Sequence, residues 1–191
     1  KDNGVSLDSI LECKKEYTKQ LILYLTDPIL EGIHSIFEDS IKVALLHKQP
    51  NHILKYFQSY LREVPKWSKV NIEREVKRIE RKTDCDWFEN IIFAVFVSHI
   101  KIMMLVGDED NKTIKLNMPT IEYFIHKTYI QTAKAFHERP FLAINKPMPN
   151  TPFAQMAPID IQNTIYQAKK VIQESIENTI RMLLPVKEIL N

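Results

Sequence analysis

The sequence predicts an all-α fold, a single bundle of about six to seven helices with a Pro-rich extended arm before the last long helix. Apolar residues recur at three-to-four spacing nearly throughout the chain. Glycine occurs only at Gly4, Gly32 and Gly107, and the absence of Asn-Gly and Asp-Gly turns argues against a hairpin-rich β fold. Five of the ten prolines lie between Pro140 and Pro158, a density that no helix survives.

Three amphipathic helices are expected in the first third of the chain. An apolar stripe over 7–24 predicts the first of them. Asp27 is a natural N-cap and Pro28 suits a first helical position, so a second helix should begin there and run over 28–47. The third covers 53–61 and stops before the next proline.

Two helices of opposite character follow. Ser68 can cap a short helix in which eight of the ten residues from Glu73 to Lys82 are charged, the pattern of a surface helix with a thin apolar stripe. Thr83 or Asp84 then caps the most apolar part of the chain, 85–107, which Gly107 ends.

The last elements are set by prolines. Residues 114–118 alternate apolar and polar side chains and predict a short extended segment. Pro119 and Thr120 begin another helix. Asp160 caps the last long helix, and Pro185 ends it or begins a further turn.

This pattern divides the chain into a main helical domain over 1–139, an extended arm over 140–159, and a C-terminal helix over 160–191 that packs on the main domain. The arm is too apolar for a free linker, so it packs either on its own domain or on a neighbouring subunit. Its candidate partner-binding residues are Phe141, Leu142, Met148, Phe153 and Met156.

Composition excludes several classes of function. The 26 basic and 24 acidic residues leave a net charge of only +2, so attraction to nucleic acid requires a local patch. Phosphate-cradling loops need clustered glycines, which the chain lacks. Cys13 and Cys85 do not form a disulfide framework and indicate reduced thiols in a cytosol-like compartment. The beginning of the sequence has no apolar segment typical of a signal peptide.

The apolar stretch over 85–107 is long enough to cross a membrane, but its charges argue against this. His99 and Lys101 lie well inside it, and a charged residue at mid-membrane costs roughly 2.5–3.5 kcal/mol. We therefore expect the central helix of a bundle. Cys85 and His99 are about 21 Å apart on one helix and cannot form a catalytic dyad.

No catalytic, cofactor-binding or metal-ligating residues are predicted. Glu31 and His34 form one Glu-x-x-His half-motif, whereas a di-iron bundle needs two such pairs and two further glutamates. The stretch over 107–119 fails as a calcium-binding EF-hand, because Lys112 occupies an acidic position and Pro119 replaces the final Glu. The sequence thus favours a protein that is not an enzyme.

The charged helix offers a candidate nucleic-acid surface. Its basic residues could contact phosphates, although interleaved glutamates reduce the net charge of the segment to about +2. The candidate phosphate-contacting residues are Lys69, Arg74, Arg78, Arg81 and Lys82.

Several segments carry a family resemblance: DPILEGIHSIFEDS, ILKYFQSYLREVPKW, CDWFENIIFAVFVSHIKIM, YFIHKTYIQTAKAF and IQESIENTIRMLLPVKEIL. They are similar to an uncharacterised all-helical protein family of nucleocytoplasmic large DNA viruses. The resemblance implies no activity and no cofactor. It implies a viral protein of the virion or of the virus factory in the host cytoplasm.

Two functions are expected in that setting. The first is a non-enzymatic structural or assembly protein, such as a minor capsid or internal virion component. Its expected partners are other viral proteins, and a second copy of the chain is a further candidate partner. The alternative is a nucleic-acid-associated factor in viral transcription or genome packaging, which would use the basic side of residues 66–82.

Overall fold

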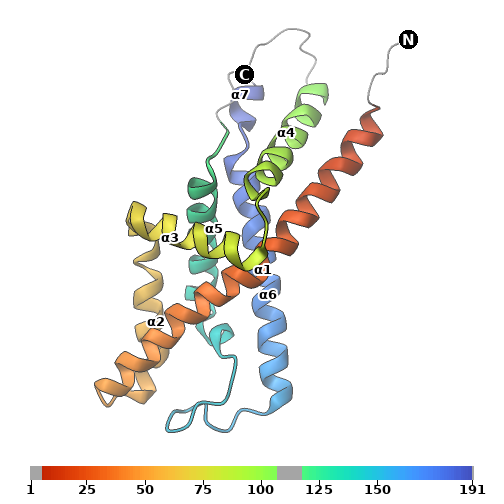
Figure 1. Ribbon diagram of the computed structural model, residues 1–191. Helices are drawn as coiled ribbons and strands as arrows, with labels where there is room; N and C mark the ends of the chain where they lie inside the picture. The colour runs from red at the N-terminus through yellow and green to blue at the C-terminus, as the bar shows by residue number, and fades with distance from the viewer. Residues whose placement is uncertain (1–5, 107–117, 191) are drawn as a thin grey trace.

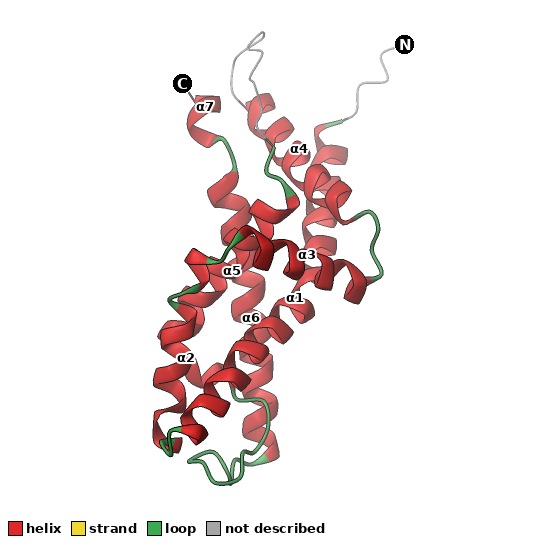
Figure 2. Cartoon of the chain, turned by 60° about the vertical axis from the view of Figure 1, so that its left-hand side comes forward, coloured by secondary structure: helices red, strands yellow, loops and turns green. Residues whose placement is uncertain are grey.

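The computed structural model describes residues 6–106 and 118–190, and within these ranges it contains helices and loops but no strand (Figures 1 and 2). The all-α prediction is confirmed. The helices are α1 (Leu7–Leu46), α2 (Ile53–Leu61), α3 (Lys69–Thr83), α4 (Phe88–Val106), α5 (Ile121–Glu138), α6 (Pro158–Leu183) and α7 (Val186–Leu190), with 3₁₀ turns η1 (Pro50–His52), η2 (Val64–Lys66) and η3 (Pro140–Ala143). Most of the extended segment expected over 114–118 lies outside the described residues.

Helix α1 is a single helix of 40 residues, so the predicted break at Pro28 is wrong. A proline inside a helix removes one backbone hydrogen bond and costs roughly 3 kcal/mol. The apolar stripe keeps its phase across Pro28, with Leu25, Ile29 and Ile33 all fully buried. Each such side chain contributes about 1.5–3 kcal/mol on burial, which outweighs the cost of the proline. Asp27, the expected cap, instead pairs with Lys169 of α6 at 2.9 Å.

Helix α1 runs along most of the molecule and contacts different helices with its two halves (Figure 1). The first half lies against α4, where the ring of Tyr24 meets Trp87 edge-on at 5.2 Å. The second half lies against α2, where Phe37 meets Phe57 at 5.2 Å. Helices α5 and α6 pack against each other, and α6 also packs on α1. The middle of α1 is therefore the centre of the core.

Helix α3 begins as predicted, because Ser68 accepts a hydrogen bond from the backbone N–H of Asn71 at 3.3 Å. Only Val76 and Ile79 are buried along it, the expected thin stripe. Asp84 does not begin the next helix. It ends α3 in the left-handed conformation, with φ of 48°, and its N–H bonds to the carbonyl of Glu80. Helix α4 starts later, at Phe88, and the expected end at Gly107 lies outside the described residues.

Helix α4 lies toward one end of the bundle, between α1 and α7, rather than at its centre as expected (Figures 1 and 2). One face, with Phe88, Val95 and Phe96, is buried, whereas Phe93 and Leu105 are 55% and 60% exposed. Among the described residues, only Phe88–Leu105 has the length and composition to cross a membrane, and 39% of it is buried. Its buried face packs mainly on α1, while the other face is left uncovered by the described residues.

The Pro-rich arm packs on its own chain. Leu142 and Met148 are 3% and 6% exposed, and Phe153 and Met156 pack partly buried against the same core. Lys146 adds an ion pair with Glu38 of α1 at 3.3 Å. Of the two alternatives left open by the sequence, the described structure shows the wrap over the chain's own core.

Helix α6 begins two residues before the predicted Asp160 cap. Pro158 occupies the first helical position after Ala157, and Asp160 lies in the first turn, where its charge favours the positive end of the helix dipole. The predicted stripe is buried through Ala168, Ile172, Ile176 and Ile180. As expected, Pro185 separates α6 from the short α7.

Candidate functional site

An open apolar groove lies between the first turns of α1 and the exposed face of α4. It encloses about 310 Å³. Its lining residues come from both helices and are Ile10, Cys13, Tyr17, Phe93, Ala94, Val97, Ser98 and Lys101. The residues of α1 recur at three-to-four spacing, as do Phe93, Val97 and Lys101 of α4, so each helix turns one face toward the groove.

At this end of the molecule the first turns of α1 lie beside α4, on the side away from α7 (Figures 1 and 2). In α1, no residue before Leu21 is buried, although α1 begins at Leu7. Two large apolar side chains of the lining are left exposed, with Tyr17 39% and Phe93 55% exposed. An apolar surface shared by two neighbouring helices is typical of a contact site for another helix.

Polar groups near the groove are few and are mostly held by the chain itself. The Nδ1 of His99 donates to the carbonyl of Val95 at 2.8 Å. Burial lowers the pKa of His99 below its ordinary value, and the charge of Lys14 lowers it further. Burial also raises the pKa of the Cys85 thiol, which is 3% exposed in the core. Cys13, in contrast, is exposed in the groove.

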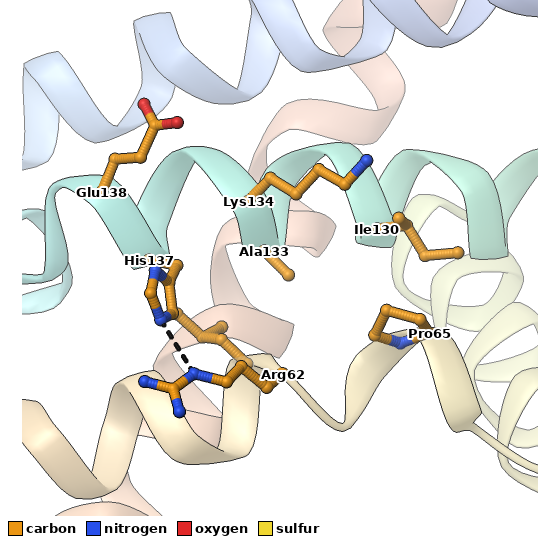
Figure 3. A pocket seen from close by; sticks show the side chains of 8 residues that line it. Arg62, Pro65, Ile130, Ala133, Lys134, His137 and Glu138 are labelled. Carbon is orange, nitrogen blue, oxygen red and sulfur yellow. Dashed lines mark hydrogen bonds between the residues drawn. The ribbon is translucent and has the colours of Figure 1, made fainter.

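A second concave surface lies between α2 and α5 and encloses about 430 Å³ (Figure 3). Leu61, Pro65, Ile130 and Ala133 form its apolar part. At one end the Nε of Arg62 donates to the Nε2 of His137 at 3.1 Å, and Figure 3 shows the terminal nitrogens of Arg62 on the side away from Ile130. Gln58 donates to the carbonyl of His137 at 2.8 Å. These bonds join the two helices, and Lys134 is a further cation that lines the surface.

The predicted phosphate-contacting residues of α3 are largely occupied within the fold. Arg78 pairs with Glu75 at 2.5 Å and with Glu31 of α1 at 3.3 Å. Lys82 pairs with the same Glu31 at 2.9 Å, and Lys69 lies 3.7 Å from Glu73.

The two remaining arginines of this set are exposed. Arg81 donates to the backbone carbonyl of Lys77 at 3.2 Å, and Arg74 has no carboxylate partner within the described ranges. The structure therefore does not assemble the five basic residues into one uncompensated patch.

Arg78 also belongs to a polar cluster that the sequence did not reveal. Its Nη2 donates to the carbonyl of Pro28 at 2.6 Å, and the hydroxyl of the fully buried Tyr129 donates to Glu75 at 2.6 Å. Burial and the neighbouring Glu75 carboxylate raise the pKa of Tyr129 well above its ordinary value. The cluster joins α1, α3 and α5. The only signal for it in the sequence was Gly32, a glycine inside a helical pattern.

The candidate arm residues are placed unequally. Leu142 and Met148 are buried in the chain's own core, so neither is available to a partner in this conformation. Phe153 and Met156 are partly buried there. Phe141 alone of the five is largely exposed, at 52%.

The Glu31 and His34 half-motif is not assembled into a larger site. Glu31 is paired with Arg78 and Lys82, and the Nε2 of His34 is buried without a hydrogen-bond partner. Within 6–106 and 118–190, no three His, Cys, Asp or Glu side chains lie close enough to share a metal ion.

The fold defines an all-α helical protein with open grooves between its helices. Residues 7–144, more than half of the chain, match DUF5764, a family of unknown function. The chain belongs to that family. The match covers α1 to η3 and ends before α6. No curated protein and no solved structure matches the chain.

Proposed function

We propose that this chain is a helical protein–protein interaction module in virion structure or assembly, such as a minor capsid or internal virion component, and that the α1–α4 groove is its contact surface. The observation that carries the proposal is the exposed apolar surface of that groove, where Tyr17 and Phe93 are 39% and 55% exposed. Burying such side chains against a partner removes apolar area from water, the main driving force of association.

The shape of the groove favours a helical partner. Its two walls are helices that present apolar side chains one turn apart, so an amphipathic helix can lay its own stripe between them. A contact of this kind gains its affinity from a few central aromatic side chains. In the groove these are Tyr17 and Phe93.

The viral setting rests on the segments that resemble a family of large DNA viruses. Their implied location is the virus factory or the virion itself. The groove supplies the physical means for a protein without assigned chemistry to act there, through contact alone. Other viral proteins of the particle are the partners that this proposal implies.

The test uses the virus that encodes the protein. Quantitative mass spectrometry of purified virions should detect the native chain, and the double variant Tyr17→Ser/Phe93→Ser should lose most of this incorporation. Tyr166→Ser is the matched control, because Tyr166 is 61% exposed on α6 and does not line the groove. Absence of the native chain from particles, or equal incorporation of the groove variant, contradicts the proposal.

A nucleic-acid-associated function is the alternative, and exposed Arg74 and Arg81 support it. The double variant Arg74→Gln/Arg81→Gln removes the two basic residues of the set that pair with no carboxylate among the described residues. If phosphate contact were the function, retention of DNA and RNA at low salt would fall strongly in this variant. We expect retention to be unchanged.

A further inference from the structure

The two helices that form the groove run in opposite directions. Tyr24 of α1 lies against Trp87, just before α4 begins. Lys14, nearer the start of α1, is close enough for its charge to lower the pKa of His99, which lies further along α4. Because both helices rise by about 1.5 Å per residue, each residue toward the start of α1 lies level with one residue further toward the end of α4. Counted from the Tyr24–Trp87 contact, Cys13 is therefore level with Ser98, and Ile10 is level with Lys101 at the open end.

One acidic residue at the edge of this groove has no cation partner. Glu16 precedes Tyr17 in α1, and its side chain accepts a hydrogen bond from Gln20 at 2.8 Å. No Lys, Arg or His of the described residues forms an ion pair with it. Glu16 is the neighbour of Tyr17, which lines the groove, so its carboxylate lies beside the groove on the α1 side. Lys101 of α4 lines the groove itself.

We infer that the α1–α4 groove binds a second copy of this chain, through a two-fold axis that passes close to Cys13. This axis lays the first turns of α1 from the second copy antiparallel to those of the first. Glu16 lies three residues after Cys13 and Ile10 lies three residues before it. The axis therefore places Glu16 of the second copy level with Ile10, beside Lys101.

Charge and apolar surface then complement each other in the same arrangement. The ion pair between Glu16 and Lys101 forms twice, once on each side of the axis, as a two-fold contact requires. Tyr17 and Phe93 of both copies lose their exposure to water in the space between. The exposed thiols of the two Cys13 residues meet near the axis. This inference rests on the proposed function, because both take the α1–α4 groove as the contact surface, and it identifies the partner as a second copy of the chain.

Sedimentation equilibrium of the full chain tests the charge pairing. The native chain should dimerise, and Glu16→Lys or Lys101→Glu should each weaken the dimer by at least about tenfold, because like charges then face each other twice. The double variant Glu16→Lys/Lys101→Glu should return to within about threefold of the native Kd, since the reversed pair is again attractive.

Glu174→Lys is the matched control. Glu174 is an exposed glutamate of α6, far from the proposed axis in α1, and does not line the groove. Its reversal should leave the Kd nearly unchanged. A native chain that stays monomeric at its highest soluble concentration overturns the inference, as does a double variant no better than the two single ones. Circular dichroism of each variant separates a weakened dimer from an unfolded chain.

Cross-linking locates the axis. A short bis-maleimide should join two native chains through Cys13 and leave the buried Cys85 unmodified. Cys13→Ser should abolish the product. A covalent dimer that persists in Cys13→Ser, or no product at concentrations where the native chain is dimeric, contradicts the placement of the axis.

The dimer and the virion function fail in different ways. If the chain dimerises with the predicted charge pairing but is absent from particles, the dimer is supported and the proposed function is contradicted. If the native chain stays monomeric but the variant Tyr17→Ser/Phe93→Ser is lost from virions, the dimer is contradicted. The proposed function is then supported, with a different protein bound in the groove.

Discussion

The hydroxyl of Tyr129 donates a hydrogen bond to Oε1 of Glu75 at 2.6 Å, and it does so directly against the backbone of Gly32. A Cβ atom at residue 32 would lie 2.0 Å from that hydroxyl oxygen. Helix α1 can approach α5 only because residue 32 has no side chain. Glu75 in turn holds Arg78, which bonds to the carbonyl of Pro28 one turn before Gly32. Three helices thus meet at one aromatic hydroxyl.

Removal of this hydroxyl should destabilise the fold without altering its shape. Tyr129→Phe keeps the fully buried ring but leaves the Glu75 carboxylate with Arg78 alone. A buried hydrogen bond to a charged group contributes roughly 1.5–3 kcal/mol, so we expect a loss of that size in the free energy of unfolding. Urea denaturation measures it. Tyr166→Phe, at an exposed tyrosine, is the control and should change stability by less than about 0.5 kcal/mol.

A methyl group at Gly32 should also be destabilising. In an open helix, Gly to Ala gains about 0.5–1 kcal/mol, but here the new Cβ forces Tyr129 away from Glu75. We expect Gly32→Ala to lose about 1–3 kcal/mol, as overpacked cores do.

The double variant Gly32→Ala/Tyr129→Phe is the sharper measurement, because both changes disturb the same contact. Its loss should be smaller than the sum of the two single losses. Strict additivity in the denaturation curves would show that Gly32 is not required for the approach of Tyr129.

Mild acid should weaken the fold. Burial lowers the folded-state pKa of His34 and of His99, while both have their ordinary pKa, about 6.5, in the unfolded chain. The unfolded state therefore binds more protons, and the stability due to these groups is present above pH 6.5 and is lost as the pH falls through their lowered folded-state pKa values.

Denaturation curves between pH 7.5 and 5 measure this effect, and the free energy of unfolding should fall across that range. His99→Gln keeps a side-chain donor for the Val95 carbonyl and should make the decline shallower. A native curve that is flat over this interval contradicts the predicted direction.

Two adjacent residues of the Pro-rich arm test how it packs. Leu142 is 3% exposed and Phe141 is 52% exposed. Leu142→Ala should cost about 2–5 kcal/mol, because it leaves a cavity in the core. Phe141→Ala should cost less than about 0.5 kcal/mol, as a surface change does. Equal losses in the thermal or urea unfolding of the two variants would show that the arm does not pack on its own chain in solution.

The extent of sequence prediction differs from element to element. The spacing of apolar residues predicted the helices, and Ser68 and Thr120 predicted two starts that the structure confirms through their bonds to the N–H groups of Asn71 and Tyr123. These signals are local, since a cap and a stripe depend on residues within a few turns. The break predicted at Pro28 failed because the burial that carries α1 through the proline comes from other helices.

The candidate sites were predicted less well, for the same reason. The charges of α3 were apparent from the sequence, but the pairing of Arg78 and Lys82 with Glu31 joins residues about 50 positions apart. The stripe of α1 was recognised, yet nothing in the order of residues indicated that its first turns would remain uncovered beside α4. An exposed face and a buried face have the same local pattern until the packing is known.

Periodicity, capping and proline act over short distances, so the order of residues was enough to predict that this protein is helical, where most of its helices lie, and that proline interrupts the arm. Which apolar faces meet became apparent only from the packing of the helices. This packing buried Leu142 and Met148 in the chain's own core, joined Tyr129 to Glu75 beside Gly32, and left Tyr17 and Phe93 exposed at the groove. These outcomes depend on contacts between residues far apart in the chain, which apolar burial drives without any local signal.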